Sequence, residues 1–227
     1  MSYPSATKFR ATLRKRGIDV SAEFVNEVVA DQGVRQLTAA APRFTGNVTA
    51  RRVDDRWMGD LIDYTAKASK GSPAHVMILQ DVFSRFIFAQ ALQSKTEVTA
   101  AFSRIVQETG RKCEEFNTDR GSEWTSATFQ TRLNNLGIRH RLKVGPQDLA
   151  TLDRAIGTLR ATLSRRTAEG GTWWEELDAA VKSMNESEHP ALFMNEPGEV
   201  TGDDDLRFDL RYHNAEMATE NQEEAEK

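Results

Sequence analysis

Three aspartates stand in sequence contexts that a metal-dependent nuclease requires. Asp60 interrupts the apolar run WMGDLIDY, Asp119 lies in FNTDRGSEWTS, and Asp153 lies in LDRAIGTLR. Exchange of a phosphodiester bond needs an activated water or 3′-hydroxyl and stabilisation of the charge on the phosphate, and two Mg²⁺ ions supply both. Because Mg²⁺ prefers hard oxygen ligands, carboxylates without His or Cys are a suitable set. The pattern therefore indicates a two-metal site for phosphodiester chemistry.

The expected position of each aspartate agrees with this interpretation. An unpaired carboxylate within an apolar strand is costly, and a metal at Asp60 would remove that cost. Asp119 is expected at the end of a strand, where open α/β sheets bind ligands. Gly121 allows the backbone to approach a phosphate closely. Asp153 is expected near the start of a long helix, from which its carboxylate could reach the strand ends.

Other roles for these carboxylates stay open on spacing alone, because an aspartate is also a common turn, cap or ion-pair residue. Asp63 lies three residues beyond Asp60 and is expected on the opposite face of the strand. Asp81 is interpreted as structural, Asp148 as a helix cap, and Glu123 as a residue that holds the loop after Asp119.

The remainder of the chain predicts an α/β fold that would position these residues. Apolar runs predict strands over 57–63, 75–81, 86–92 and 138–142, with another that ends at Asp119. Caps and glycine stops predict helices over 96–109, 126–136, 148–166 and 172–187. This order predicts a mixed five-stranded sheet with helices on both faces.

The N-terminal part predicts a small helical module rather than strands. Helices are expected over 5–17 and 21–32, with Ser21 as the cap of the second. The five basic side chains in the first helix could contact DNA phosphates, although a packing appendage or dimer arm is an equal alternative. The expected organisation is a helical module at 1–37, a linker at 38–53, a core at 54–200 and an acidic tail at 201–227.

The charge distribution makes nucleic acid a reasonable partner despite a net charge of −4. Residues 196–227 hold 11 acidic and three basic side chains, which leaves 27 basic and 23 acidic ones in the preceding part. In the linker, Arg51 and Arg52 could follow a nucleic-acid backbone, although solvated charge is the more common meaning. Cys113 is the only cysteine, which excludes an internal disulfide. No apolar stretch reaches the roughly 20 residues that span a bilayer, so no membrane association is expected.

The motifs together resemble the catalytic core of retrovirus-like integrases. The resemblance covers residues 54–200 and is nearest to gypsy-type retrotransposons and Maverick/Polinton elements. It rests on WMGDLIDY, ILQDVFSRFIFAQALQSKT, NTDRGSEWTSATFQ, LGIRHRL and DRAIGTLR, followed by WWEELDAAVKSMNESEHPALFMNEPGEV.

This resemblance implies an RNase H-like fold and a metal site built from Asp60, Asp119 and Asp153. It implies 3′-end processing of element DNA and strand transfer into target DNA with two Mg²⁺ or Mn²⁺ ions. DNA and further copies of the chain are the implied partners, and the nucleus of a eukaryotic host is the implied location. The basic residues expected on DNA are Arg51, Arg52, Arg120, Lys143, Arg154 and Arg160.

Two positions depart from the family pattern. Its third acid is normally Glu, followed by a basic residue and an Asn, whereas this chain has Asp153 and Ile156. The aspartate is one methylene shorter at a site where metal distances are narrow. Gly157 stands where another basic contact is expected.

Three functions therefore remain open. The first is an integrase or transposase core that exchanges DNA strands. The second is a catalytically impaired, integrase-derived protein that binds DNA or assists assembly. The third is a nuclease for RNA–DNA hybrids, which rests only on the shared fold.

Overall fold

The structure is a computed structural model, and the parts of the chain that it describes fall into two compact units. One unit comprises residues 52–198, and the other comprises 1–51 together with 199–227. The described residues are 20–21, 24, 50–143, 149–168 and 170–225. Most of the expected N-terminal helical module and linker, and Asp148, lie outside them.

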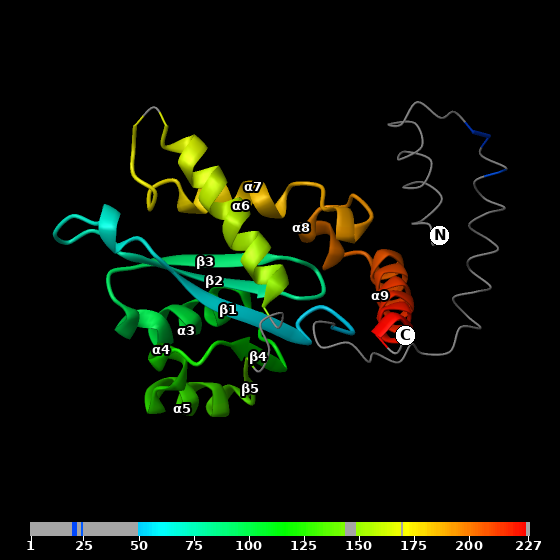
Figure 1. Cartoon of the computed structure of the whole chain (residues 1–227), viewed down its shortest axis with the longest axis horizontal. Coiled ribbons are helices and arrows are strands. Elements are labelled where there is room, and N and C mark those ends of the chain that lie inside the picture. Colours follow the sequence, from blue (N-terminus) through cyan, green and yellow to red (C-terminus); the bar gives the residue numbers. More distant parts are fainter. Residues whose placement is uncertain (1–19, 22–23, 25–49, 144–148, 169, 226–227) are drawn as a thin grey trace. The chain divides into compact units, whose positions relative to one another are not determined.

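The unit formed by residues 52–198 contains one mixed sheet with strand order β3-β2-β1-β4-β5 (Figure 1). Three strands form an antiparallel meander, and the other two add in parallel beside β1. The strands are β1 (Arg56–Asp63), β2 (His75–Asp81), β3 (Ile87–Leu92), β4 (Glu115–Thr118) and β5 (Arg139–Leu142). This arrangement confirms the expected five-stranded sheet.

Helices cover both faces of the sheet, as expected. In Figure 1, α6 and α7 lie over one face, and α3, α4 and α5 lie over the other. The α-helices of this unit are α3 (Val98–Thr109), α4 (Ser122–Thr125), α5 (Ala127–Leu136), α6 (Ala150–Arg166) and α7 (Leu177–Asn185). The 3₁₀ helices are η1 (Thr65–Lys67), η2 (Lys95–Glu97) and η3 (Pro190–Leu192).

The helix ends agree with the sequence in some places and differ in others. Gly110 and Gly137 end α3 and α5 in the left-handed conformation, and Ser126 caps α5 by accepting the Phe129 N–H. Thr96 lies within η2 and does not cap α3. The helix expected over 172–187 is wrong at its start, because α7 begins at Leu177.

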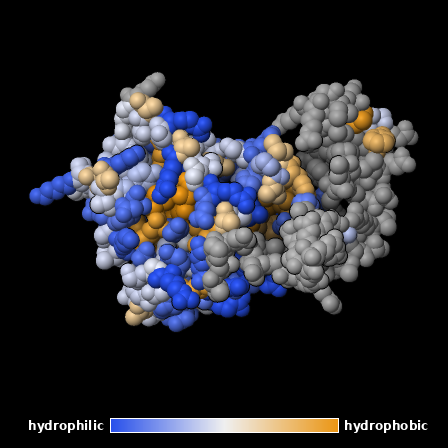
Figure 2. Space-filling view, viewed as in Figure 1, coloured by the Kyte–Doolittle hydropathy of each residue, from blue (hydrophilic) through white to orange (hydrophobic). Residues whose placement is uncertain are grey.

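Aromatic side chains form the main hydrophobic core beneath the strand ends. Phe116 of β4 lies against Phe102, Trp124 and Phe129 with ring-centroid distances of 5.1–5.9 Å. Gly59 of β1 is required at this point because a Cβ there would lie 2.4 Å from the Phe116 ring. Hydrophilic side chains cover most of the visible face of this unit, and apolar ones gather in its middle (Figure 2).

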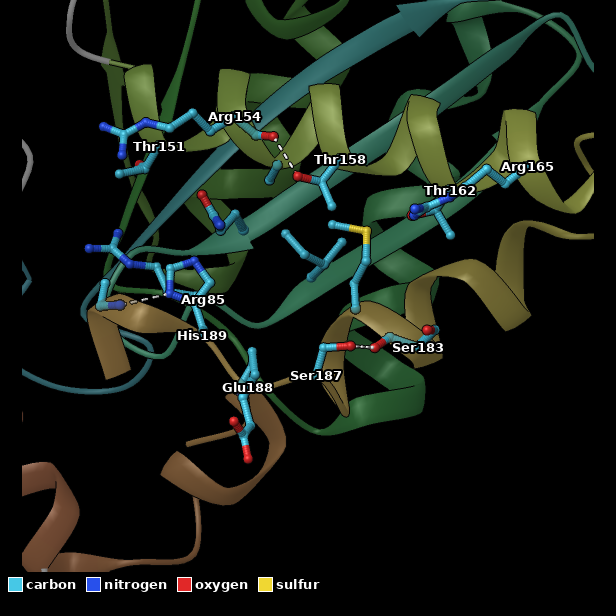
Figure 3. A pocket seen from close by; sticks show the side chains of 16 residues that line it. Arg85, Thr151, Arg154, Thr158, Thr162, Arg165, Ser183, Ser187, Glu188 and His189 are labelled. Atoms are coloured by element: carbon cyan, nitrogen blue, oxygen red, sulfur yellow. Dashed lines mark hydrogen bonds between the residues drawn. The ribbon is translucent and has the colours of Figure 1, made fainter. Parts of the chain in front are cut away.

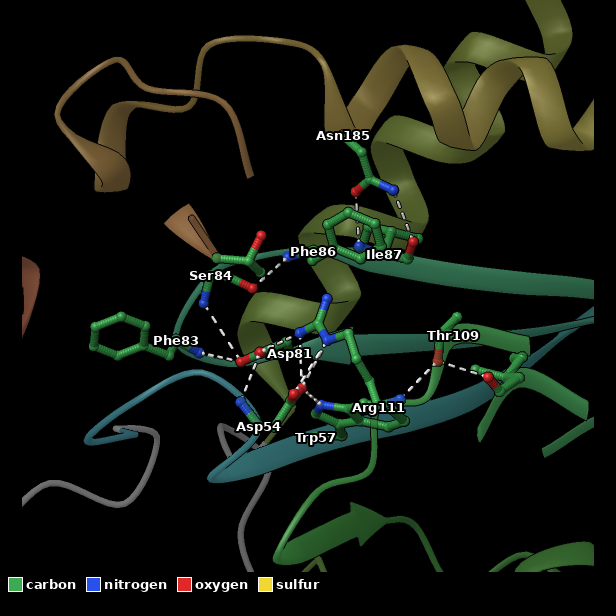
Figure 4. A network of polar contacts seen from close by, with 12 residues as sticks. Asp54, Trp57, Asp81, Phe83, Ser84, Phe86, Ile87, Thr109, Arg111 and Asn185 are labelled. Atoms are coloured by element: carbon green, nitrogen blue, oxygen red, sulfur yellow. Dashed lines mark hydrogen bonds and ion pairs between the residues drawn. The ribbon is translucent and has the colours of Figure 1, made fainter. Parts of the chain in front are cut away.

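A buried ion-pair network holds the start of β1 against the end of β2 (Figure 4). Arg111 Nη2 lies 2.9 Å from Asp81 Oδ2 and 2.7 Å from Asp54 Oδ1. The Asp81 carboxylate also accepts the N–H groups of Asp54 and Phe83. Burial raises the pKa of Asp81 to about 6, so the carboxylate is ionised at neutral pH. Asp81 therefore has the structural role that its sequence position suggested.

The described residues of the other unit form two regions of regular structure. Ser21 Oγ accepts the N–H of Phe24 at 3.1 Å, the bond expected of a helix cap. The acidic C-terminal residues form α9 (Asp204–Ala225), and α8 (Pro197–Val200) precedes it in the sequence. Among the helices described, none is long and apolar enough to cross a membrane.

Candidate active site

Asp60 and Asp119 lie at matching positions on neighbouring strands. Met58 of β1 pairs with Asn117 of β4 in a parallel register. Asp60 and Asp119 each follow two residues later, and side chains two residues apart point to the same side of a strand. The register therefore brings the first two candidate carboxylates together beside the carboxyl end of β4, in the interior of the sheet order. Asp119 directly follows Thr118, the last residue of β4, as the sequence predicted.

Asp153 reaches the same region from α6. It lies in the first turn of this helix, and its N–H donates to Leu149 O at 2.9 Å. Thr151 Oγ1 lies 3.4 Å from Met58 Sδ, which places the start of α6 over β1 just before Asp60. The Asp153 side chain is exposed, and its negative charge is favourable near a helix N-terminus.

The three aspartates and Glu123 act on one another electrostatically. Burial is the main cause that raises the pKa of Asp60 above its ordinary value, although the Leu61 N–H bonded to Oδ1 at 2.7 Å lowers it. The charges of Asp119, Asp153 and Glu123 raise this pKa further. A divalent cation among these groups would offset the repulsion between them.

Glu123 was interpreted from the sequence as a loop residue, but its carboxylate faces the candidate site. A Cβ added to Gly121 would lie 2.7 Å from Glu123 Oε1 and 3.0 Å from Asp119 Oδ1. The two carboxylates thus converge on a space that only glycine leaves open. The Gly121 N–H also donates to Asp119 Oδ1 at 2.9 Å, which fixes the orientation of that carboxylate. The sequence did contain a signal for this role, because Glu123 follows Gly121 by two residues shortly after the end of β4.

A hydrogen-bond relay supports the backbone at Asp119. Gln130 Nε2 lies 2.7 Å from His140 Nδ1, and His140 Nε2 lies 2.9 Å from Thr118 Oγ1. Thr118 Oγ1 in turn donates to Asp119 O at 2.8 Å. Burial lowers the pKa of His140, so the ring is neutral and donates through Nε2. Sequence inspection missed this relay because it depends on the pairing of β4 with β5.

The donor chemistry of the site fits hard divalent cations. All four carboxylates present oxygen ligands, and Asp60 and Asp119 lie beside the carboxyl end of β4. Within the described residues, no three His, Cys, Asp or Glu side chains converge closely enough to surround one ion. Of the three aspartates, Asp153 is exposed, whereas Asp60 and Asp119 are half-buried.

Two of the expected DNA-contacting cations lie on α6 beside Asp153. Arg154 and Arg160 are both exposed. Arg160 follows Asp153 by seven residues, two helical turns, and so lies on the same side of α6. Its charge acts on Tyr64, which stacks on Trp173 at 4.5 Å between ring centroids.

The other expected cations are more dispersed. Arg120 is exposed directly beside Asp119, and half-buried Lys143 donates its N–H to Thr118 O at 2.8 Å. Arg52 forms an ion pair with Glu114, so its charge is already partnered. Arg51 is exposed and belongs to the other unit.

Comparison with known proteins agrees with the geometry of this site. Residues 50–144 match the family described as Integrase core domain. The chain is 28% identical over 142 residues to the Retrovirus-related Pol polyprotein from transposon TNT 1-94 of Nicotiana tabacum. That match covers 58% of this chain and 11% of the polyprotein, so the chain spans about a tenth of the length of this relative.

Solved structures with a similar fold include retroviral integrase catalytic core domains. The HTLV-2 integrase catalytic core domain in complex with magnesium aligns with a TM-score of 0.56 at 18% identity, covering 66% of this chain and 97% of that domain. A chain from the simian T-cell lymphotropic virus intasome in complex with PP2A regulatory subunit B56 gamma aligns with a TM-score of 0.61 at 17% identity, covering 85% of this chain and 70% of its own length. The structural matches show the RNase H-like fold that the sequence predicted, and the family match places an integrase core domain over residues 50–144.

Proposed function

We propose that this chain is a metal-dependent integrase or transposase core that cuts and joins DNA strands. The observation that carries the proposal is the position of Asp60 on β1 and of Asp119 just after β4, each two residues beyond the Met58–Asn117 pair of these parallel strands. Asp153, in the first turn of α6, supplies the third carboxylate.

Each side chain of the site has a specific part in this proposal. Asp60, Asp119 and Asp153 would hold two Mg²⁺ or Mn²⁺ ions, which activate the attacking oxygen and stabilise the leaving one. Asp119 is held in place by the Gly121 N–H and by the relay through Thr118. Exposed cations beside the carboxylates, Arg120, Arg154 and Arg160, would contact DNA phosphates and orient the strand.

Several finer features belong to the same proposal. The reactions would be 3′-end processing of element DNA and its transfer into target DNA, with gypsy-type or Maverick/Polinton elements as the nearest kin by motif. The HTLV-2 domain is described in a trimeric form and the simian virus protein in an intasome, which supports self-association here. Action on chromosomal DNA would place the protein in a eukaryotic nucleus.

A second function stays an alternative because of one residue. Asp153 is exposed and is one methylene shorter than the Glu that the family pattern has. An integrase-derived protein that binds DNA without cutting it would have this arrangement. It would bind duplex DNA through the same arginines and give no cleavage with any metal.

The test is a comparison of substrates with and without metal. Supercoiled plasmid, linear duplex and RNA–DNA hybrid are each incubated with the protein in Mg²⁺, Mn²⁺ or EDTA. Metal-dependent nicking of the plasmid supports the integrase core. Binding of duplex DNA without nicking in any condition supports the second function, and selective cleavage of the hybrid supports a hybrid nuclease.

A further inference from the structure

A cavity lies on the unit formed by residues 52–198, between α6 and the chain that leads out of α7 (Figure 3). It has a volume of about 320 Å³. Its wall includes one stripe of α6, marked by Arg154, Thr158 and Arg165, and apolar side chains such as Ile87 and Met184. None of the three candidate metal ligands lines it.

One end of this cavity is lined by cationic and hydrogen-donating groups from three separate elements. Arg85 comes from the turn between β2 and β3, Arg154 from α6, and His189 from the segment before η3. Figure 3 shows Arg85 and His189 beside each other, with Arg154 nearby on α6, while Arg165 lies at the other end. The only acidic lining residue, Glu188, directs its carboxylate away from Arg85 and Arg154.

The guanidinium of Arg85 is buried without a partner for one of its nitrogens. Among the described residues, Nη1 has no hydrogen-bond acceptor and almost no contact with solvent. The backbone of Arg85 has a φ of 61°, a left-handed conformation that favours glycine or asparagine over arginine. The charge of Asp81 already acts on Arg85, but within the described residues no acceptor is bonded to Nη1, so a further anion would reduce the cost of burying this cation. This combination distinguishes Arg85 from an ordinary surface arginine.

The neighbouring groups indicate what kind of anion fits. His189 Nδ1 accepts the Ala191 N–H at 3.1 Å, so the neutral ring presents Nε2–H as a donor. Burial and the charges of Arg85 and Arg154 lower the pKa of His189, which keeps the ring neutral. Gln80 Oε1, also on the cavity wall, is buried without a donor within the described residues. The ligand must therefore accept several hydrogen bonds and donate one.

We propose that this end of the cavity binds a phosphate group that carries a hydroxyl, either free phosphate or the terminal phosphate of a DNA strand. Its oxygens would accept hydrogen bonds from Arg85, Arg154 and His189. The hydroxyl of free phosphate, or of a strand-terminal phosphate in its monoanionic form, would donate to Gln80. Of these two ligands, only the terminal phosphate of a DNA strand depends on the proposed strand-transfer function; binding of free phosphate does not. Because Arg154 directly follows Asp153 and points about 100° away from it around α6, a strand end held here would lie beside the carboxylate site, not in it.

Binding is measured with the whole chain in EDTA, so that no metal can hold the anion. Isothermal titration uses inorganic phosphate, a short duplex with 5′-phosphates, and the same duplex with 5′-hydroxyls. Wild type is compared with Arg154→Gln, which changes an exposed side chain, and with Arg85→Gln. The matched control is Arg165→Gln, which removes one charge from the same helix at the far end of the cavity.

We expect one saturable site that Arg154→Gln weakens about tenfold, the effect of losing one charge-assisted hydrogen bond. We expect Arg85→Gln to abolish binding and Arg165→Gln to change affinity by less than about twofold. Binding of inorganic phosphate supports the proposal with free phosphate as the source. A preference for the 5′-phosphorylated duplex that Arg154→Gln removes supports it with a strand end as the source.

The proposal is overturned if neither inorganic phosphate nor the 5′-phosphorylated duplex binds, or if Arg85→Gln and Arg154→Gln bind as wild type does. The titrations are repeated with Asp119→Asn, in which phosphate binding is expected to persist. Phosphate binding is measured without metal and plasmid nicking with metal, so neither measurement depends on the other. A negative result for the phosphate site is therefore distinguishable from a negative result for the proposed nuclease activity.

Discussion

Asp60 and Asp119 occupy equivalent positions on two adjacent parallel strands, each two residues beyond the Met58–Asn117 pair. This relationship places two carboxylates side by side although 58 residues separate them in the sequence. Their repulsion contributes to the raised pKa of Asp60. The pairing of β1 with β4 therefore brings these two acids together. Their electrostatic repulsion is a free-energy cost that a bound cation would offset.

Lengthening the third carboxylate is expected to improve catalysis. Asp153 is exposed in the first turn of α6, and Asp153→Glu extends its reach by one methylene toward Asp60 and Asp119. We expect initial rates of plasmid nicking to rise about tenfold or more in Asp153→Glu, because small displacements in such sites have large effects. Asp153→Asn should reduce the rate. A slower Asp153→Glu would show that the site is already adapted to aspartate.

Filling the space at Gly121 is expected to disturb the site without unfolding the protein. In Gly121→Ala, the new Cβ would lie within 3.0 Å of oxygens from both Glu123 and Asp119. We expect nicking to fall about 100-fold, while the melting temperature changes little. The matched control is Gly157→Ala in α6, where a Cβ meets no atom within 4 Å. That change should stabilise the helix by about 1 kcal/mol. Equal nicking rates in the two variants would refute this role for Gly121.

The Arg111 network is expected to contribute strongly to stability. Arg111→Met leaves the fully buried Asp81 carboxylate without its cation, which costs about 3–5 kcal/mol. The double variant with Asp81→Asn should recover part of this loss, because the uncompensated charge is gone. Urea unfolding of the two single variants and the double variant measures the coupling. Additive losses would show that the two side chains act independently.

Acidification is expected to weaken the support of Asp119 through His140. The pKa of His140 is lowered in the folded state, so the unfolded state binds more protons below about pH 6.5. His140 therefore contributes a fall in the free energy of unfolding as the pH drops below that value, whereas Asp81, whose pKa is raised to about 6, contributes a change of the opposite sign. His140→Gln should show a smaller loss between pH 7 and pH 5 in urea titrations. His189 shares the direction of shift and contributes a residual slope in both proteins. Parallel pH profiles would contradict the assignment to His140.

The sequence predicted the sheet well because its apolar runs and glycine stops are local signals. The strand ranges expected from 57, 75 and 86 onward agree with the structure within one residue, and Gly110 and Gly137 end their helices as predicted. The four-residue helix α4 was missed, since so short a segment carries no periodicity.

The candidate site was predictable only in part. Asp60, Asp119 and Asp153 were identified from their contexts, but the sequence cannot set the β1–β4 register that joins the first two. Glu123 was assigned to the loop because its direction depends on the turn at Gly121. The His140 relay depends on strand pairing and was not predictable from the sequence.

The most direct test of the account is the rate of supercoiled plasmid nicking by three proteins in Mn²⁺. Wild type is compared with Asp119→Asn and with Asp63→Asn, which removes a carboxylate from the exposed end of β1 outside the site. The account predicts nicking by wild type and Asp63→Asn, and a loss of at least about 100-fold in Asp119→Asn. Equal nicking by wild type and Asp119→Asn, or no nicking by wild type, would contradict it.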